Sequence, residues 1–128
     1  MNEYYSAILG HPYYKRIKIH IEKQDPLQFS FMAASDNELT YIPTKFSTGQ
    51  LNVAALSIFL SNSKLMRGQL PMLALDDPTQ NMDHDHKEAF AKLVSRLVED
   101  FQVIVATEDD ETRDYLKKYC TEATCYEL

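Results

Sequence analysis

Hydrophobic and polar residues alternate in two short stretches near the beginning of the chain. Ile17, Ile19 and Ile21 are separated by polar residues, and the stretch 27–31 repeats this pattern with leucine and phenylalanine. A period of two residues is typical of a β-strand that buries one face. Residues 23–26 lie between the two stretches and end in proline, which favours a turn. The pattern therefore predicts an antiparallel hairpin with one buried face.

The pattern changes in the second half of the chain, where hydrophobic residues recur every three or four positions, as in amphipathic helices. Two continuous apolar runs, at 72–75 and 103–106, favour strands of a parallel sheet that are buried on both faces. Strand, helix, strand and helix in this order predict a right-handed parallel unit. Asp85 and Glu88 predict a capping box at the start of the helix between the two strands. The other expected elements are helices over 3–9, 49–66, 85–99 and 110–120, and strands over 39–42 and 121–128.

Length and composition are those of a single folded domain. The chain has 128 residues, of which 45% are hydrophobic and 25% are charged, and these fractions are ordinary for a globular protein. The net charge of −6 disfavours a dedicated nucleic-acid-binding domain, which usually carries a basic patch. The 3 glycines are too widely spaced for a phosphate loop or a dinucleotide fingerprint. Cys120 and Cys125 are expected to be free thiols, and we expect neither a signal peptide nor a membrane span.

The stretch Phe46-Ser47-Thr48-Gly49-Gln50 is the first candidate for chemistry, because it comes directly before a long expected helix. Small residues let the backbone approach an anion closely, and a helix N-terminus offers unpaired N–H groups and a positive dipole end. Serine and threonine are also favoured helix caps, so a plain N-cap explains the same residues. Anion binding and simple capping are both open at this point.

Two aspartates, Asp76 and Asp77, follow the first apolar run. Carboxylates at the carboxyl end of a buried strand lie where α/β sheets bind ligands. One of them can hold Mg²⁺, usually through water, and the other can orient an attacking water, although a strand end followed by a turn is the simpler interpretation. Residues 83–86 (Asp-His-Asp-His) have the composition of a metal cluster, but a helix cap accounts for them better. His11 and His20 are isolated and are expected to face solvent.

These features occur in an order that resembles the carboxyl-terminal half of an ABC-type ATPase head. The likeness covers about residues 40–120 and is closest in kind to the SMC, RecN and SbcC group of coiled-coil ATPases. Ser47, Thr48, Gly49 and Gln50 match the signature motif of the family, Leu-Ser-Gly-Gly-Gln, with Phe46 in place of leucine and Thr48 in place of a glycine. Asn81, Met82 and Asp83 match its D-loop.

The same resemblance assigns roles around the first apolar run. Residues 72–77 match the Walker B motif, in which Asp76 would hold Mg²⁺ and Asp77 would stand where the catalytic base is usually glutamate. Glu108 falls where the family has its switch histidine. The resemblance therefore makes Asp77 and Glu108 the catalytic candidates, and it makes residues 47–50 those that would bind the ATP held by an opposing head.

The implied fold is the α/β carboxyl-terminal half of a P-loop NTPase, in which an amino-terminal antiparallel hairpin is followed by a parallel βαβα unit. Residues 1–14 would be the end of a coiled-coil helix, or simply a terminal helix that packs on its own domain. Residues 15–128 would form the carboxyl-terminal lobe, and the Walker A lobe would be absent. The implied partners are that amino-terminal Walker A lobe, a second head in a homodimer, and DNA through the full-length protein, with no membrane.

The implied function is ATP hydrolysis between two heads of a cytoplasmic DNA-repair or chromosome-maintenance protein, with ATP and Mg²⁺ as cofactors. The chain alone would be inactive, because it lacks the phosphate loop. Glu108 in place of histidine and Asp77 in place of glutamate keep a second function open, a non-catalytic half-head that only dimerises or binds a partner. Another ABC-type ATPase, from a transporter or a phage or defence system, is the third.

Overall fold

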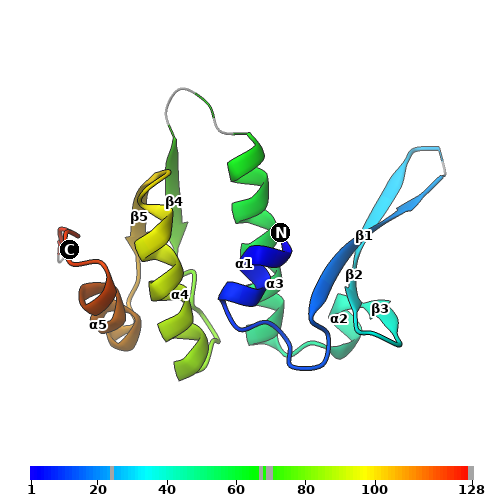
Figure 1. Ribbon diagram of the computed structural model, residues 1–128, viewed down its shortest axis with the longest axis horizontal. Helices are drawn as coiled ribbons and strands as arrows, with labels where there is room; N and C mark the ends of the chain where they lie inside the picture. Colours follow the sequence, from blue (N-terminus) through cyan, green and yellow to red (C-terminus); the bar gives the residue numbers. More distant parts are fainter. Residues whose placement is uncertain (24, 67, 69–70, 127–128) are drawn as a thin grey trace.

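The structure is a computed structural model that describes residues 1–23, 25–66, 68 and 71–126. Among these residues, a short first helix is followed by three strands and two helices, and strands and helices alternate in the second half of the chain. The first two strands extend to one side, away from the long helices (Figure 1). The elements are α1 (Asn2–Ala7), β1 (Arg16–Glu22), β2 (Gln28–Ala34), β3 (Leu39–Tyr41), α2 (Ile42–Lys45), α3 (Thr48–Leu65), β4 (Met72–Asp76), α4 (His84–Leu97), β5 (Gln102–Ala106) and α5 (Asp110–Tyr119).

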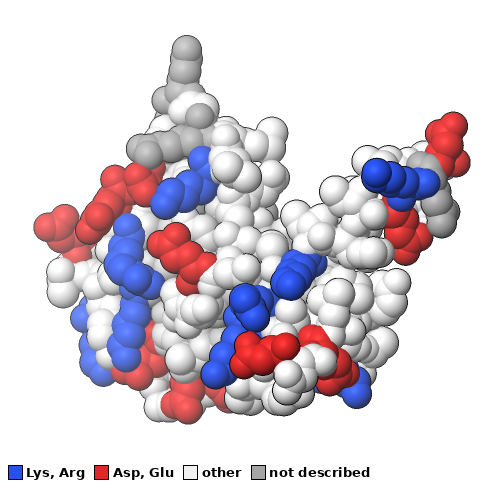
Figure 2. Space-filling model, turned by 45° about the vertical axis from the view of Figure 1, so that its right-hand side comes forward, with Lys and Arg blue, Asp and Glu red and all other residues white. Residues whose placement is uncertain are grey.

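The first three strands form an antiparallel sheet in the order β1-β2-β3, which confirms the predicted hairpin. Ile17 pairs with Ala33 and is buried, but Ile19 and Ile21 on the same face are 56% and 57% exposed. The hairpin points away from the helices in Figure 1 and stands off the body as an arm in Figure 2. The prediction of one face buried along its whole length is wrong, because the strands extend beyond the body on which they pack.

Strands β4 and β5 pair in parallel and are connected through α4, which confirms the predicted parallel unit. Leu73 and Leu75 are buried in the core, whereas Met72 and Ile104 are about half exposed. The prediction that both strands are buried on both faces is therefore wrong. Their residues alternate between core and solvent, because the core contacts one face of this two-stranded sheet.

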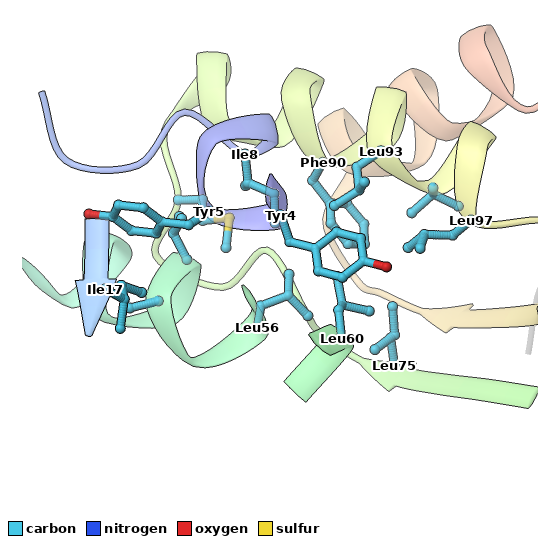
Figure 3. Packing of buried hydrophobic residues seen from close by; sticks show 14 of the residues in the cluster. Tyr4, Tyr5, Ile8, Ile17, Leu56, Leu60, Leu75, Phe90, Leu93 and Leu97 are labelled. Carbon is cyan, nitrogen blue, oxygen red and sulfur yellow. The ribbon is translucent and has the colours of Figure 1, made fainter. Parts of the chain in front are cut away.

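One hydrophobic core joins the short first helix to the long helices and to β4 (Figure 3). Tyr4, Tyr5 and Ile8 at the start of the chain are buried together with Leu60 of α3 and Phe90 of α4. Truncating a fully buried phenylalanine to alanine usually costs about 3–5 kcal/mol, so these contacts fix α1 to the domain. The assignment of residues 1–14 to the end of a coiled coil stays a prediction.

Helix α4 is capped two residues earlier than the sequence suggests. Asp83 is its N-cap, and the Oδ1 atom of Asp83 accepts a hydrogen bond from the N–H of His86 at 3.0 Å. The predicted capping box of Asp85 and Glu88 is therefore wrong, because Asp85 already lies inside the first helical turn. Glu88 instead accepts a hydrogen bond from the Tyr119 hydroxyl of α5.

The chain after α5 also differs from the prediction. Residues 121–126 contain a turn and irregular backbone, so the predicted strand over 121–128 is wrong for this part, and residues 127–128 lie outside the described residues. An extended segment becomes a strand only where another strand accepts its hydrogen bonds, and the described strands pair among themselves. Cys120 and Cys125 are free thiols, as predicted. Within the described ranges, the helices are too short or too polar to cross a membrane.

Candidate functional site

The stretch before α3 forms a complete helix cap. Ser47 Oγ accepts a hydrogen bond from the Gln50 N–H at 3.3 Å, and Gln50 Oε1 accepts one from the Ser47 N–H at 3.0 Å. This reciprocal pair is a capping box. The N–H groups of Thr48 and Gly49 have no carbonyl partner inside the helix, because the first turn of a helix has no turn before it. The cap therefore keeps two N–H donors at the positive end of an 18-residue helix.

Gly49 brings this cap against the loop that follows β4. A Cβ atom built on Gly49 would lie 2.3 Å from the carbonyl oxygen of Asn81, so only glycine fits at this position. Asn81 itself has a φ of 61°, in the left-handed region. Beside this contact, the side-chain amide of Asn52 donates a hydrogen bond to the carbonyl of Gln80. The two segments that resemble the signature and the D-loop are therefore in direct contact.

Asp76 and Asp77 stand at the carboxyl end of β4, as the sequence predicts. Asp76 is exposed and pairs with Ala106 at the end of β5. The N–H of Asp77 donates to the carbonyl of Ala106 at 2.9 Å, and its Oδ1 accepts a hydrogen bond from the Glu108 N–H at 3.2 Å. With a φ of 41°, Asp77 lies in the left-handed region, where a non-glycine residue costs about 1–3 kcal/mol and where functional residues are frequent.

An open cavity of about 460 Å³ lies beside these residues, between the loops that follow β4 and β5 and the first turn of α4. Three of the sequence-predicted residues, Asp77, Asn81 and Glu108, share this cavity. The complete lining is Asp77, Thr79, Gln80, Asn81, Met82, Lys87, Thr107, Glu108 and Asp109. Polar and charged side chains dominate the lining, with three carboxylates and one lysine.

The other sequence-predicted residues lie outside the lining of the cavity. Asp76 ends the adjacent strand, and Asp83 caps α4. Residues 47–50 are connected to the cavity through the contact between Gly49 and Asn81. The structure therefore brings Asp77, Asn81 and Glu108 to one cavity and sets the stretch that resembles the signature against its edge.

Lys87 is a residue of the cavity that the sequence did not reveal. Its Nζ lies 2.9 Å from Asp109 Oδ1 and 3.0 Å from Glu111 Oε2, and its side chain is only 15% exposed. The hydrogen bond to Asp109 is the main reason that the pKa of Lys87 is raised, so this cation is held firmly charged. Burial acts to raise the pKa of Asp109, but hydrogen bonds from Thr112 and Lys87 outweigh it and lower that pKa.

A buried hydrogen bond fixes the cavity loop to α5. Thr79 Oγ1 and Thr112 Oγ1 lie 2.7 Å apart, and both residues are almost completely buried. The Thr112 hydroxyl also donates to Asp109 Oδ2 at 2.5 Å, so the hydroxyl that donates between the two threonines is that of Thr79. The two threonines are 33 residues apart in the sequence. Neither this pair nor Lys87 is part of a sequence motif, so the sequence alone contains no signal for them.

The Asp-His-Asp-His run at 83–86 serves as a helix start. Asp83 Oδ1 lies 2.6 Å from His86 Nδ1, and the hydrogen bond from the His86 N–H is the main cause that lowers the pKa of Asp83. His84 Nδ1 lies 2.5 Å from Glu111 Oε1, and the hydrogen bond between them raises the pKa of His84. In the part of the chain that the structure describes, no three potential metal ligands of the histidine, cysteine, aspartate or glutamate type converge.

The sequence is similar to several Rad50 proteins. It is 36% identical over 77 residues to the DNA double-strand break repair Rad50 ATPase of Aeropyrum pernix, a match that covers 58% of this chain and 8% of that protein. It is 31% identical over 120 residues to the DNA repair protein RAD50 of Arabidopsis thaliana, covering 80% of this chain and 9% of that protein. The chain thus spans less than a tenth of the length of these two relatives. No protein-family model matches it.

The fold is similar to that of a solved Smc head bound to the carboxyl-terminal winged-helix domain of ScpA. The TM-score is 0.70 at 17% sequence identity, and the match covers 89% of this chain and 34% of that one. At 17% identity this likeness shows the fold alone, and the family is indicated by the sequence relatives. The Rad50 relatives, the parallel unit and the likeness to an Smc head together support the assignment of the chain to the carboxyl-terminal head half of the ABC-type SMC/Rad50 family.

Proposed function

We propose that this chain is the carboxyl-terminal lobe of a head that binds and hydrolyses ATP between two heads of a DNA-repair or chromosome-maintenance protein. The observation that carries the proposal is the contact between Gly49 and Asn81, because it sets the signature stretch beside the cavity that holds Asp77 and Glu108. The similarity to a Rad50 ATPase supports the nucleotide and the reaction. The phosphate loop, the second head and any DNA contact belong to the parts of the protein outside this chain.

The carboxylates at the end of β4 fit a magnesium nucleotide. Asp76 is exposed at the last position of the strand and offers the oxygen donors that Mg²⁺ prefers. When bound, the metal ion would neutralise charge on the phosphates. Asp77 would accept a proton from the attacking water, with the hydrogen bond from the Glu108 N–H holding one of its oxygens in place.

The signature stretch would act on the nucleotide of the opposing head. Ser47 Oγ accepts a hydrogen bond from Gln50, so its own O–H remains able to donate outward. The N–H of Gly49 adds a second donor at the N-terminus of α3, where anions are favoured. These donors would join the γ-phosphate of one head to the other head, so ATP binding would promote dimerisation.

The test uses a head reconstituted from this chain and its amino-terminal Walker A lobe. Asp77→Asn should retain ATP binding, abolish turnover and accumulate the ATP-bound dimer in sedimentation experiments. Ser47→Arg should prevent the dimer without weakening nucleotide binding by one head. Asn62→Arg is the matched control, because it adds the same cation on α3 about 22 Å away.

The outcomes separate the two leading functions. Turnover in the wild type that is lost in Asp77→Asn supports the ATPase. ATP-dependent dimerisation without any turnover supports the non-catalytic half-head instead. If Ser47→Arg dimerises as well as Asn62→Arg does, the stretch before α3 is only a helix cap.

A further inference from the structure

The loop between α1 and β1 folds around the imidazole of His11, contrary to the expectation that this side chain simply faces solvent. His11 Nδ1 accepts hydrogen bonds from the backbone N–H groups of Tyr13 at 3.0 Å and Tyr14 at 3.1 Å. Nδ1 is separated from Cα by as many bonds as the side-chain oxygen of asparagine, so the arrangement has the geometry of an Asx turn. His20, in contrast, is exposed on β1 as expected.

The same imidazole packs on Phe46, the first residue of the candidate signature stretch. The rings of His11 and Phe46 are stacked, with centroids 5.1 Å apart and planes 18° from parallel. Phe46 is buried and also lies near the rings of Tyr5 and Tyr14. The next residue along the chain is Ser47, the cap of α3.

On its other side, the loop is hydrogen-bonded to Tyr5 of α1. The Tyr5 hydroxyl donates to the carbonyl of Tyr14 at 3.0 Å and accepts a hydrogen bond from the His11 N–H at 2.8 Å. The Tyr5 ring also lies so close to Gly10 that a Cβ there would be 2.5 Å from it. His11 is therefore fixed to the core of the domain on one side and to Phe46 on the other.

We infer that His11 is a positioning residue that holds Phe46, and through it the capped start of α3, in the place from which Ser47 and Gly49 would meet a nucleotide. The inference that His11 positions Phe46 depends only on contacts within this chain. Its meaning for a nucleotide rests on the proposed function.

The arrangement requires a neutral imidazole with its proton on Nε2. A protonated Nδ1 would face two backbone N–H donors, and its own hydrogen would displace both bonds. Burial lowers the pKa of His11, which favours the neutral form. The side chains that contact His11 are the phenol of Tyr5 from α1, the ring of Tyr14 from the loop and the ring of Phe46, and none of these is a carboxylate or an amine.

Two substitutions separate the acceptor from the ring. His11→Asn keeps an acceptor at the same number of bonds and removes the stacked ring, whereas His11→Phe keeps a ring and removes the acceptor. Amide hydrogen exchange, followed by NMR on the chain without nucleotide, measures the effect of losing the acceptor and the effect of losing the ring separately. In His11→Asn the amides of Gln50 and Leu51 should exchange at least about tenfold faster while those of Tyr13 and Tyr14 stay protected. His11→Phe should show the reverse.

His20→Asn and His20→Phe are the control variants, and they should leave the exchange rates of all these amides unchanged. The amides of α4 are the internal control, and their exchange rates should be the same in every variant. Uniform acceleration across all helices, or no acceleration at residues 50 and 51, would overturn the inference. If the variants fail to fold, the wild type still decides it. The ¹⁵N signals of His11 at pH 7 should show a protonated Nε2 and an unprotonated Nδ1, and the opposite tautomer would refute it.

The proposed function is tested separately by the same variants in the reconstituted head. His11→Asn should weaken ATP-dependent dimerisation and leave nucleotide binding by a single head unchanged. A loosened start of α3 with undiminished dimerisation would overturn the link between His11 and the nucleotide. Absence of dimerisation in the wild type would count against the proposed function and leave the role of His11 in the loop intact.

Discussion

Gly49→Ala should separate the two loops that meet beside the cavity. The added Cβ would lie 2.3 Å from the Asn81 carbonyl oxygen, and ordinary contact begins at 3.4 Å, so the loops have to part by about 1 Å. The obstacle is backbone on both sides and cannot rotate away as a side chain could. Overpacking of this kind costs about 1–3 kcal/mol. For a chain of this length, about 2 kcal/mol lowers the melting temperature by about 6–12 °C.

Gly68→Ala is the matched control, because nothing lies within 4 Å of a Cβ at that position. Both substitutions restrict the unfolded chain similarly, so this contribution cancels when the two are compared. Thermal and urea denaturation of the two variants measure the difference directly. If Gly49→Ala is as stable as Gly68→Ala, the close approach of the start of α3 to Asn81 does not exist, and the argument that joins the signature stretch to the cavity loses its basis.

Three further predictions concern α4, α5 and the cavity. Hydrogen bonds from Tyr119 and from two lysines lower the pKa of Glu88 to about 2. The ionised Glu88 should therefore stabilise the fold fully above pH 4.5, and this stabilisation should disappear as the pH falls towards 2. The urea midpoints of the wild type and Glu88→Gln should converge in acid, and a difference that stays constant with pH would contradict this. Thr79→Val leaves the buried Thr112 hydroxyl without its donor and should cost about 1–2 kcal/mol, whereas Thr79→Ser should cost clearly less in the same denaturation assay. In the reconstituted head, Glu108→His should raise ATP turnover by removing a carboxylate from the cavity while keeping the backbone hydrogen bond to Asp77; lower turnover would make Glu108 itself a working catalytic group.

Local patterns predicted most of the elements of this fold. The spacing of apolar residues placed α3 and α5 within one residue of their observed limits, and period-two alternation gave the pairing of β1 with β2. Burial was harder to predict, because it depends on what covers each face. The same alternation describes Ile17 in the core and Ile21 in solvent.

The candidate site was predicted in its motifs but not in its contacts. Asp77 and Glu108 were candidates through the resemblance to the ATPase family, and the structure places them in one cavity. Lys87 lies in the cavity beside Asp109 because α4 packs against α5. His11 contacts Phe46 because the loop between α1 and β1 returns to the start of α3. Neither arrangement follows from residues that are neighbours in sequence, so no periodicity could have indicated it.

The exposed end of the β1–β2 hairpin determines how the purified chain behaves in solution. Ile21, Leu27 and Phe29 present apolar surface there, and β1 lies at the edge of the described sheet. Exposed edges and apolar patches favour association between chains, while the net charge of −6 opposes it through mutual repulsion. Added salt screens that repulsion and does not weaken the apolar attraction. The solubility of the chain should therefore fall as the ionic strength rises, and dilute buffers are the condition in which it stays dispersed.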